Sequence, residues 1–196
     1  MVILGVFFLV NLSAKDTLIV DLDKTKIQWT GQKVTGEHTG TLNLSEGWII
    51  MEDNLLNSGR LIFDMTSISN TDLESPEWKL KLENHLKDND FFAVDSFPYA
   101  ILNINDSQSI VVENSADNNQ IMANLTIRGI TQEISFPISI QKIESIFSAE
   151  GTVDIDRTLY NIQYKSGKFF ADLGDRMIYD IFSVQFMVYT EAIQKK

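Results

Sequence analysis

The sequence predicts an all-β protein, an antiparallel barrel or sandwich of about eight strands, with one helix near residues 75–87. Three observations support this fold class. Apolar and polar residues alternate along most of the chain, which is the period of half-buried strands. Stretches rich in Gly, Asn, Asp and Ser separate these runs and indicate turns. The 196 residues, 44% hydrophobic and 22% charged, are typical of a globular protein that can be a single large domain.

The first 14 residues read MVILGVFFLVNLSA and differ from the rest of the chain. The apolar run from Val2 to Val10 is too short to cross a bilayer but is typical of a signal-peptide core. Leu12, Ser13 and Ala14 then resemble a small-residue cleavage site. We therefore expect residues 1–14 to be a signal peptide, residues 15–196 to form the folded domain, and the protein to be exported. No later segment reaches transmembrane length, so we expect no stable membrane insertion after cleavage.

Four later stretches show the two-residue period most clearly. In GRLIFDMTSI, the residues Leu61, Phe63 and Met65 share one face. ISFPISI likewise places on one face Ile134, Phe136, Ile138 and Ile140. FSAEGTVDID does so for Val153 and Ile155, and DIFSVQFMVYT for Phe182, Val184, Phe186 and Val188. Pro137 has the opposite phase, and we expect it at an edge or bulge because it cannot donate to a ladder.

The stretch SPEWKLKLENHLK breaks this pattern and predicts the helix. Ser75 suits the N-cap, and Pro76 suits the first helical position. Apolar residues at intervals of four, Trp78, Leu82 and Leu86, share one face of the helix. His85 follows in the last turn, and FFAVDSFPYAILNI then returns the chain to the core through Phe91 and Phe92. We interpret His85 as the end of a lid-like helix rather than as a catalytic or ligand-binding residue.

Composition excludes several functional classes. The formal net charge is −11, with 16 basic and 27 acidic residues and no basic cluster, which argues against binding to nucleic acid or to an anionic membrane. The absence of cysteine excludes disulfides, thiolate metal sites and a cysteine nucleophile. Two histidines 47 positions apart form no metal motif, and no phosphate-binding or nucleophile-elbow motif occurs. We predict no catalytic residue, no metal site and no cofactor.

Two polar residues share the phase of apolar neighbours. His38 alternates with Gly36, Gly40 and Leu42, so a regular strand would turn it toward the apolar side. It is then a polar contact inside a ligand cavity or a histidine hydrogen-bonded within the core, or the glycines simply curve the sheet. Arg157 shares the phase of Val153 and Ile155, and an inward arginine requires a partner, either an anionic head group or a carboxylate of the protein.

Several segments together resemble the YceI-like family. They are the opening WTGxKVTGxHxG, which includes Trp29 and His38, and then LIFDMTSISNTD, LENHLKDNDFFAVDSFPYA, LTIRGITQEISFPI and GTVDIDRTLYNIQYKSG. They follow the order of the family and cover nearly the whole expected domain. Tyr160 stands where such proteins carry an aromatic residue after the Arg-Thr pair. The resemblance implies a periplasmic or secreted, lipocalin-like β-barrel with a covering helix, which binds an isoprenoid or similar amphiphile without catalysis.

A barrel of about eight strands encloses either packed side chains or one ligand. We predict that the partner is an amphiphilic lipid. A homodimer is the one protein assembly that we consider. Two alternatives are a non-catalytic envelope or stress-related interaction module with a packed interior, and a hydrolase or isomerase that uses a histidine with carboxylates. The residues that we expect to contact the ligand are Trp29, His38, Leu42, Phe63, Met65, Phe92, Val153, Ile155, Arg157, Phe182 and Phe186.

Overall fold

A computed structural model gives the structure of the chain and describes residues 15–52, 55–105, 110–111 and 119–191. The expected signal peptide, residues 1–14, lies outside the described residues. The structure is built almost entirely of strands: β1 (Lys15–Ile19), β2 (Lys26–Lys33), β3 (Gly36–Glu52), β4 (Leu55–Asn70), β5 (Tyr99–Ile104), β6 (Ile110–Val111), β7 (Asn119–Ile127), β8 (Ile130–Ile143), β9 (Ile146–Asp156) and β10 (Ile178–Tyr189). Helix α1 (Pro76–Lys87) and the 3-10 turns η1 (Arg157–Tyr160) and η2 (Gly174–Arg176) complete it.

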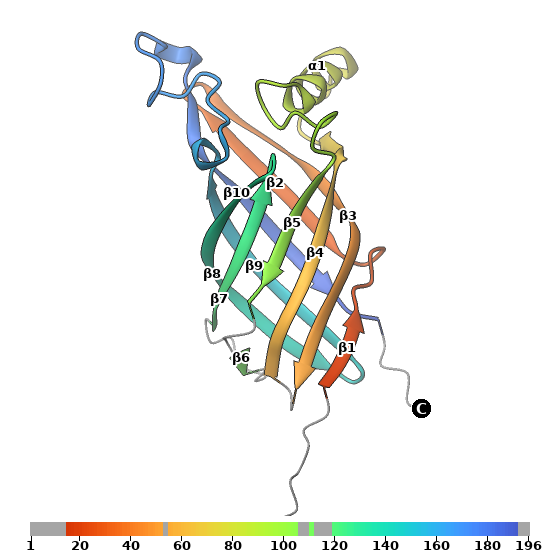
Figure 1. Ribbon diagram of the computed structural model, residues 1–196. Coiled ribbons are helices and arrows are strands. Elements are labelled where there is room, and N and C mark those ends of the chain that lie inside the picture. Colours follow the sequence, from red (N-terminus) through yellow and green to blue (C-terminus); the bar gives the residue numbers. More distant parts are fainter. Residues whose placement is uncertain (1–14, 53–54, 106–109, 112–118, 192–196) are drawn as a thin grey trace, which may run out of the picture.

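Eight of these strands close into an antiparallel barrel (Figure 1). The order around the ring is β2, β10, β9, β8, β7, β5, β4 and β3, and β3 pairs with both β4 and β2. The short β1 pairs with the C-terminal residues of β3, on the same side of β3 as β2, which pairs with its N-terminal residues. Strand β6 pairs with the first residues of β4. The structure thus confirms the all-β barrel, and the alternative of a sandwich is wrong. Closure matters because it pairs the ladder groups that an open edge would expose.

Pro137 lies at the end of a ladder, within β8. On one side it is the partner of Gln120 in β7, and on the other side the β8–β9 pairing begins only at the next residue, where Ile138 faces Gly151. Proline has no N–H to donate. The sequence therefore explains why β8 separates from β9 before this point.

Helix α1 is present where the sequence predicts it, but its apolar face is only partly covered. Ser75 occupies the N-cap position without a side-chain hydrogen bond, and none of the helical residues is buried. On its apolar face, Trp78 is 57% exposed, whereas Leu86 packs against the core. Polar contacts attach the helix as well: the Glu83 carboxylate accepts hydrogen bonds from Asn70 N at 2.7 Å and from Ser69 Oγ at 3.0 Å, at the end of β4.

The loops of one barrel end form what we call the rim: residues 33–36, 71–98, 128–129 and 157–177. Figure 1 shows α1 and the segment that follows β9 at this same end. Hydrogen bonds tie the loops together, since Arg128 Nη1 donates to Phe91 O and to Asn161 O, both at 2.9 Å. Val34 N donates to Met177 O at 3.2 Å. The opposite end holds the β3–β4 and β8–β9 hairpins.

Candidate functional site

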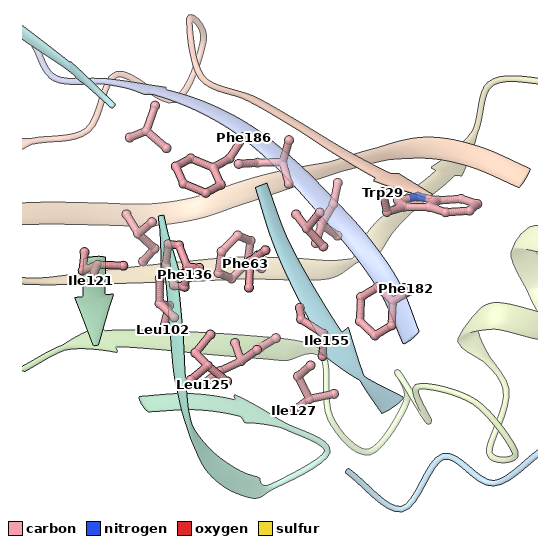
Figure 2. A pocket seen from close by; sticks show the side chains of 18 of the residues that line it. Trp29, Phe63, Leu102, Ile121, Leu125, Ile127, Phe136, Ile155, Phe182 and Phe186 are labelled. Atoms are coloured by element: carbon pink, nitrogen blue, oxygen red, sulfur yellow. The ribbon is translucent and has the colours of Figure 1, made fainter. Parts of the chain in front are cut away.

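The barrel encloses an elongated cavity of about 200 Å³. All eight ring strands contribute side chains to its wall, because every second residue of a barrel strand points inward. The lining extends from Tyr179 and Gln32 near the rim to Phe147 and Thr190 near the opposite end. Figure 2 shows labelled side chains from opposite walls, with Trp29 and Phe182 at one side of the view and Ile121 at the other.

Ten of the eleven residues predicted to contact a ligand line this cavity. Their contact with a ligand stays a prediction, but the structure brings them together around one space. They are Trp29, Leu42, Phe63, Met65, Phe92, Val153, Ile155, Arg157, Phe182 and Phe186. The phase argument worked for the strand residues because β4, β9 and β10 keep a regular alternation where these residues lie.

His38 is the exception and does not line the cavity. The β3–β4 pairing starts at Gly40 and Asn70, so His38 lies beyond the closed part of the barrel, on the hairpin that projects to the rim. There its Nδ1 atom lies 2.9 Å from Asp72 Oδ2. Asp72 also accepts hydrogen bonds from Thr39 N at 2.7 Å and Asn70 Nδ2 at 2.6 Å. The structure therefore places His38 in a local polar network and not on the cavity wall.

Arg157 is buried, with 3% of its surface exposed, and its partners belong to the protein. The guanidinium donates to the carbonyl oxygens of Ile162 at 2.9 Å, Ile178 at 3.0 Å and Tyr179 at 3.1 Å. It also donates to Asp180 Oδ1 at 3.3 Å. Burial lowers the pKa of Arg157, and the charges of Asp180 and Asp156 oppose that shift. Of our two interpretations, pairing with a carboxylate of the protein is the one observed, and Arg157 holds both ends of the loop 161–177.

Trp29 faces Gly40 across the β2–β3 ladder. A Cβ atom on residue 40 would collide with the indole ring of Trp29 and with the carbonyl oxygen of Ser69. Glycine at this position therefore leaves the space that the indole ring occupies. The indole Nε1 is buried and has no hydrogen-bond partner within the part of the chain that the structure describes. This wall of the cavity therefore holds an unused donor.

We place the mouth of the cavity between β2 and β10, where its exposed lining residues lie. Gln32 and Tyr179 are the two exposed residues among those that line it. The β2–β10 register shifts at this point, because Ile178 faces Lys33 while Phe182 faces Gly31. The chain thus advances by four residues along β10 but by only two along β2. A Cβ atom on Gly31 would meet nothing within 4 Å. An irregular pairing and an open glycine site thus coincide at the mouth.

His85 forms part of an aromatic cluster beneath α1. Its ring lies 4.6 Å from that of Tyr164 and 5.1 Å from that of Phe91, and its Nδ1 lies 3.7 Å from Asp90 Oδ1. This supports the interpretation of His85 as the end of the helix. The pairs His38–Asp72 and His85–Asp90 are separate, and neither histidine lines the cavity.

The cavity wall offers almost no charge. Arg157 is the single charged side chain among the described residues that line it, and Asp180 matches its charge. Nearby, burial raises the pKa of Tyr160 to about 12, so its phenol stays neutral at physiological pH. No group of three or more His, Asp and Glu that could hold a metal ion occurs among the described residues. In the same part of the chain, none of the helices combines the length and hydrophobicity that a bilayer crossing requires.

Sequence reasoning missed the polar residues that hold the rim. Arg128 and Glu83 are ordinary charged residues in the sequence, and neither belongs to a recognisable motif. Arg128 has a φ of 52°, a left-handed conformation next to Gly129 in the β7–β8 turn. The RG pair marks that turn, but it does not reveal which distant carbonyl groups the arginine reaches.

Comparison with known proteins agrees with this geometry. The YceI-like domain family matches residues 19–189, which is most of the chain. No curated protein sequence matches it. Among solved structures, Burkholderia cenocepacia BcnA aligns at 17% identity with a TM-score of 0.67, over 88% of this chain and 99% of its own.

Two further structures are similar. A polyisoprenoid-binding domain from Saccharophagus degradans, implicated in plant cell wall breakdown, aligns at 13% identity with a TM-score of 0.63, over 93% of this chain and all of its own. The Campylobacter jejuni YCEI protein aligns at 14% identity with a TM-score of 0.52, over 70% of this chain and 74% of its own. At such identities these likenesses show the fold alone.

Proposed function

This chain belongs to the YceI-like domain family, and from that premise we propose that its barrel binds the apolar tail of an isoprenoid or similar amphiphilic lipid, without catalysis. One observation carries the proposal: a closed barrel encloses a cavity lined by apolar side chains from all eight ring strands. The similar domain from Saccharophagus degradans is described as polyisoprenoid-binding.

The energetics of such binding follow from the wall. Each 100 Å² of apolar tail removed from water contributes roughly 2.5 kcal/mol. The ladder pairs the backbone groups along most of the wall, so a tail contacts few unpaired polar groups there besides the indole N–H of Trp29. Few polar contacts are then needed, and only near the mouth.

The size of the cavity bears on how much tail it holds. Its volume of about 200 Å³ lies below the range of about 300–1,000 Å³ that is usual for ligand pockets. A long tail therefore needs side chains such as Phe182 and Phe186 to rotate, or leaves part of its length at the mouth. Both half-buried rings line the cavity.

The observed cavity weighs against the alternative of a module with a packed interior. The hydrolase or isomerase alternative required both histidines to converge in one cleft. They instead form separate pairs with Asp72 and Asp90. These observations support a binding protein rather than an enzyme.

The N-terminal sequence supports export to the periplasm, or secretion, as part of the same proposal. The apolar run Val2–Val10 and the small residues before Lys15 form the expected signal peptide. The mass of the mature protein, purified from the cell envelope, tests this. A mature chain that begins at Lys15 is the expected result, and retention of residues 1–14 would contradict it.

Extraction of the native protein tests the binding proposal. Mass spectrometry of an organic extract should detect an apolar, isoprenoid-containing molecule in about stoichiometric amount. Protein carrying Ala149→Phe, which places a ring in the cavity, is the matched control and should carry much less. Extracts from native protein that repeatedly match the control would count against the proposal.

A further inference from the structure

Two neighbouring phenylalanines at the rim face solvent. Phe169 is 47% exposed and Phe170 is 49% exposed. Single exposed apolar residues are common on protein surfaces, but an adjacent pair on an ordered turn is less easily explained by chance. The arrangement of the turn shows that these rings are held outward.

Buried Ser166 organises this turn. Its carbonyl oxygen accepts hydrogen bonds from Phe169 N at 3.1 Å and Phe170 N at 3.0 Å. Its hydroxyl accepts one from Lys168 N at 3.2 Å, and Ser166 itself has no exposed surface. The Lys168 ammonium in turn contacts Asp156 Oδ2 at 2.7 Å. These contacts order the backbone of the turn that carries the two rings.

The turn lies beside the mouth of the cavity. Ile178 N donates to Lys165 O at 3.0 Å, which joins the turn to the first residue of β10. The next residue, Tyr179, lines the cavity and is 46% exposed. We define the rim patch as five exposed apolar residues on this turn and beside it: Val34 (42%), Phe169, Phe170, Tyr179 and Ile181 (46%).

The chemistry of the rim patch fits a bilayer surface. Phenylalanine and tyrosine rings are well suited to the boundary between lipid and water. Lys168 and Arg157 together balance Asp156 and Asp180, so these four charges cancel. Because the whole chain carries −11, a strongly anionic surface repels it and a zwitterionic surface does not.

We propose that the rim patch docks on the surface of a zwitterionic lipid bilayer and so presents the mouth of the cavity to the lipid. This inference rests on the proposed function, because a tail that moves from the bilayer into the cavity through a docked mouth avoids exposure to water. The docking is peripheral and reversible. It is therefore compatible with the absence of stable insertion that we expect from the sequence.

Co-sedimentation of the full chain with phosphatidylcholine vesicles tests the proposal. The native protein should sediment with the vesicles. The double variant Phe169→Ser/Phe170→Ser should bind about tenfold to a hundredfold more weakly, as expected for the loss of two half-exposed rings. The control is Leu22→Ser/Ile143→Ser, which removes two residues that are 43% and 55% exposed and lie outside the rim patch. It should stay within about twofold of the native protein.

Four results would overturn the inference: no binding of native protein to the vesicles, an equal loss in both variants, a steep gain with added anionic lipid, or a dimer in solution that the phenylalanine variant alone dissociates. Binding of a soluble short-chain isoprenoid alcohol, measured without vesicles, separates this inference from the proposed function. The phenylalanine variant should bind the alcohol normally. If no variant binds it while vesicle binding follows the pattern above, the cavity proposal fails and the docking surface stands. Thermal unfolding should show that all variants are folded.

Discussion

The rim and the cavity wall are stabilised in opposite ways. At the rim, the half-buried Arg128 donates to backbone carbonyl groups of two distant loops, and the buried Arg157 donates to carbonyl groups of its own loop and of β10. The cavity wall contains apolar side chains on a ladder that already satisfies its backbone. The rim depends on a few specific polar contacts, whereas the wall depends on many interchangeable apolar ones.

This difference separates stability from binding. Removing one partner from a buried polar network leaves other groups unsatisfied, which is costly. A wall residue beside a cavity faces empty space, so a change of its size alters the cavity more than it strains the fold. Substitutions at the rim should therefore change the free energy of unfolding, and substitutions in the wall should change the affinity for the ligand.

The largest expected effect comes from Arg157→Met. Three carbonyl groups and Asp180 lose their donor, and methionine fills the space without replacing any hydrogen bond. We expect the free energy of unfolding in urea to fall by about 3–5 kcal/mol. Arg157→Lys is the control, since lysine keeps the charge but has fewer donors in a different geometry. Its free energy of unfolding should lie between those of the native protein and of Arg157→Met. A change below about 1 kcal/mol would show that the loop is held by other contacts.

Ala149→Phe tests the cavity wall. Ala149 lines the cavity on β9, and an added ring would occupy part of its volume of about 200 Å³. A ligand then loses contact area comparable to that of a phenyl group, worth about 1.5–3 kcal/mol, so its affinity should fall by about tenfold to a hundredfold. The free energy of unfolding should change by less than about 1.5 kcal/mol.

Half-buried Ser148 gives the contrast for that measurement on the same strand. Ser148→Ala removes a hydroxyl from the lining but leaves its volume almost unchanged. Its affinity for an isoprenoid should stay close to that of the native protein. If Ala149→Phe destabilises the fold strongly and leaves binding intact, the division between rim and wall would be wrong.

The sequence predicts the wall better than the rim for a physical reason. Strand residues such as Phe63, Val153 and Phe186 alternate with a fixed period, so local pattern determines which of them point inward. The same logic failed for His38 because the strand continues past the closed barrel, and phase alone does not show where the partner strand ends. That boundary depends on where β4 finishes at Asn70.

Rim contacts join residues distant in sequence and follow no period. Arg157 could be predicted as buried, but its partners Ile162, Ile178 and Tyr179 contribute only backbone carbonyl groups. Any residue has such a group, so no side-chain pattern marks it. The spacing of Trp78 and Leu86 marks one face of helix α1, but it does not show that Trp78 stays exposed while Leu86 packs against the core.

Glu83→Gln tests the polar attachment of α1 and should have a smaller effect. Burial raises the pKa of the Glu83 carboxyl, but the hydrogen bonds from Asn70 N and Ser69 and the charge of Lys79 hold it below its ordinary value. Glutamine keeps an acceptor and loses the charge, so the expected loss is about 1 kcal/mol. Hydrogen exchange should show faster opening of α1, whereas Glu77→Gln, in the exposed first turn of the helix, should leave exchange near β4 unchanged.

The smallest effect is expected at Asp72, which joins the β2–β3 hairpin to the end of β4. Burial raises its pKa, but the hydrogen bonds from His38, Thr39 and Asn70 outweigh this and hold the pKa below its ordinary value of 3.8. A lowered pKa in the folded state means that the carboxylate stabilises the fold above the unfolded pKa, and that this contribution is lost as the pH falls through the folded value.

Because the pair with His38 is partly exposed, we expect Asp72→Asn to cost less than about 1 kcal/mol at pH 7. Urea unfolding of both proteins at pH 7 and at about pH 3 should show the difference shrinking in acid. A difference that grows in acid would mean that the network stabilises the rim through a group other than this carboxylate.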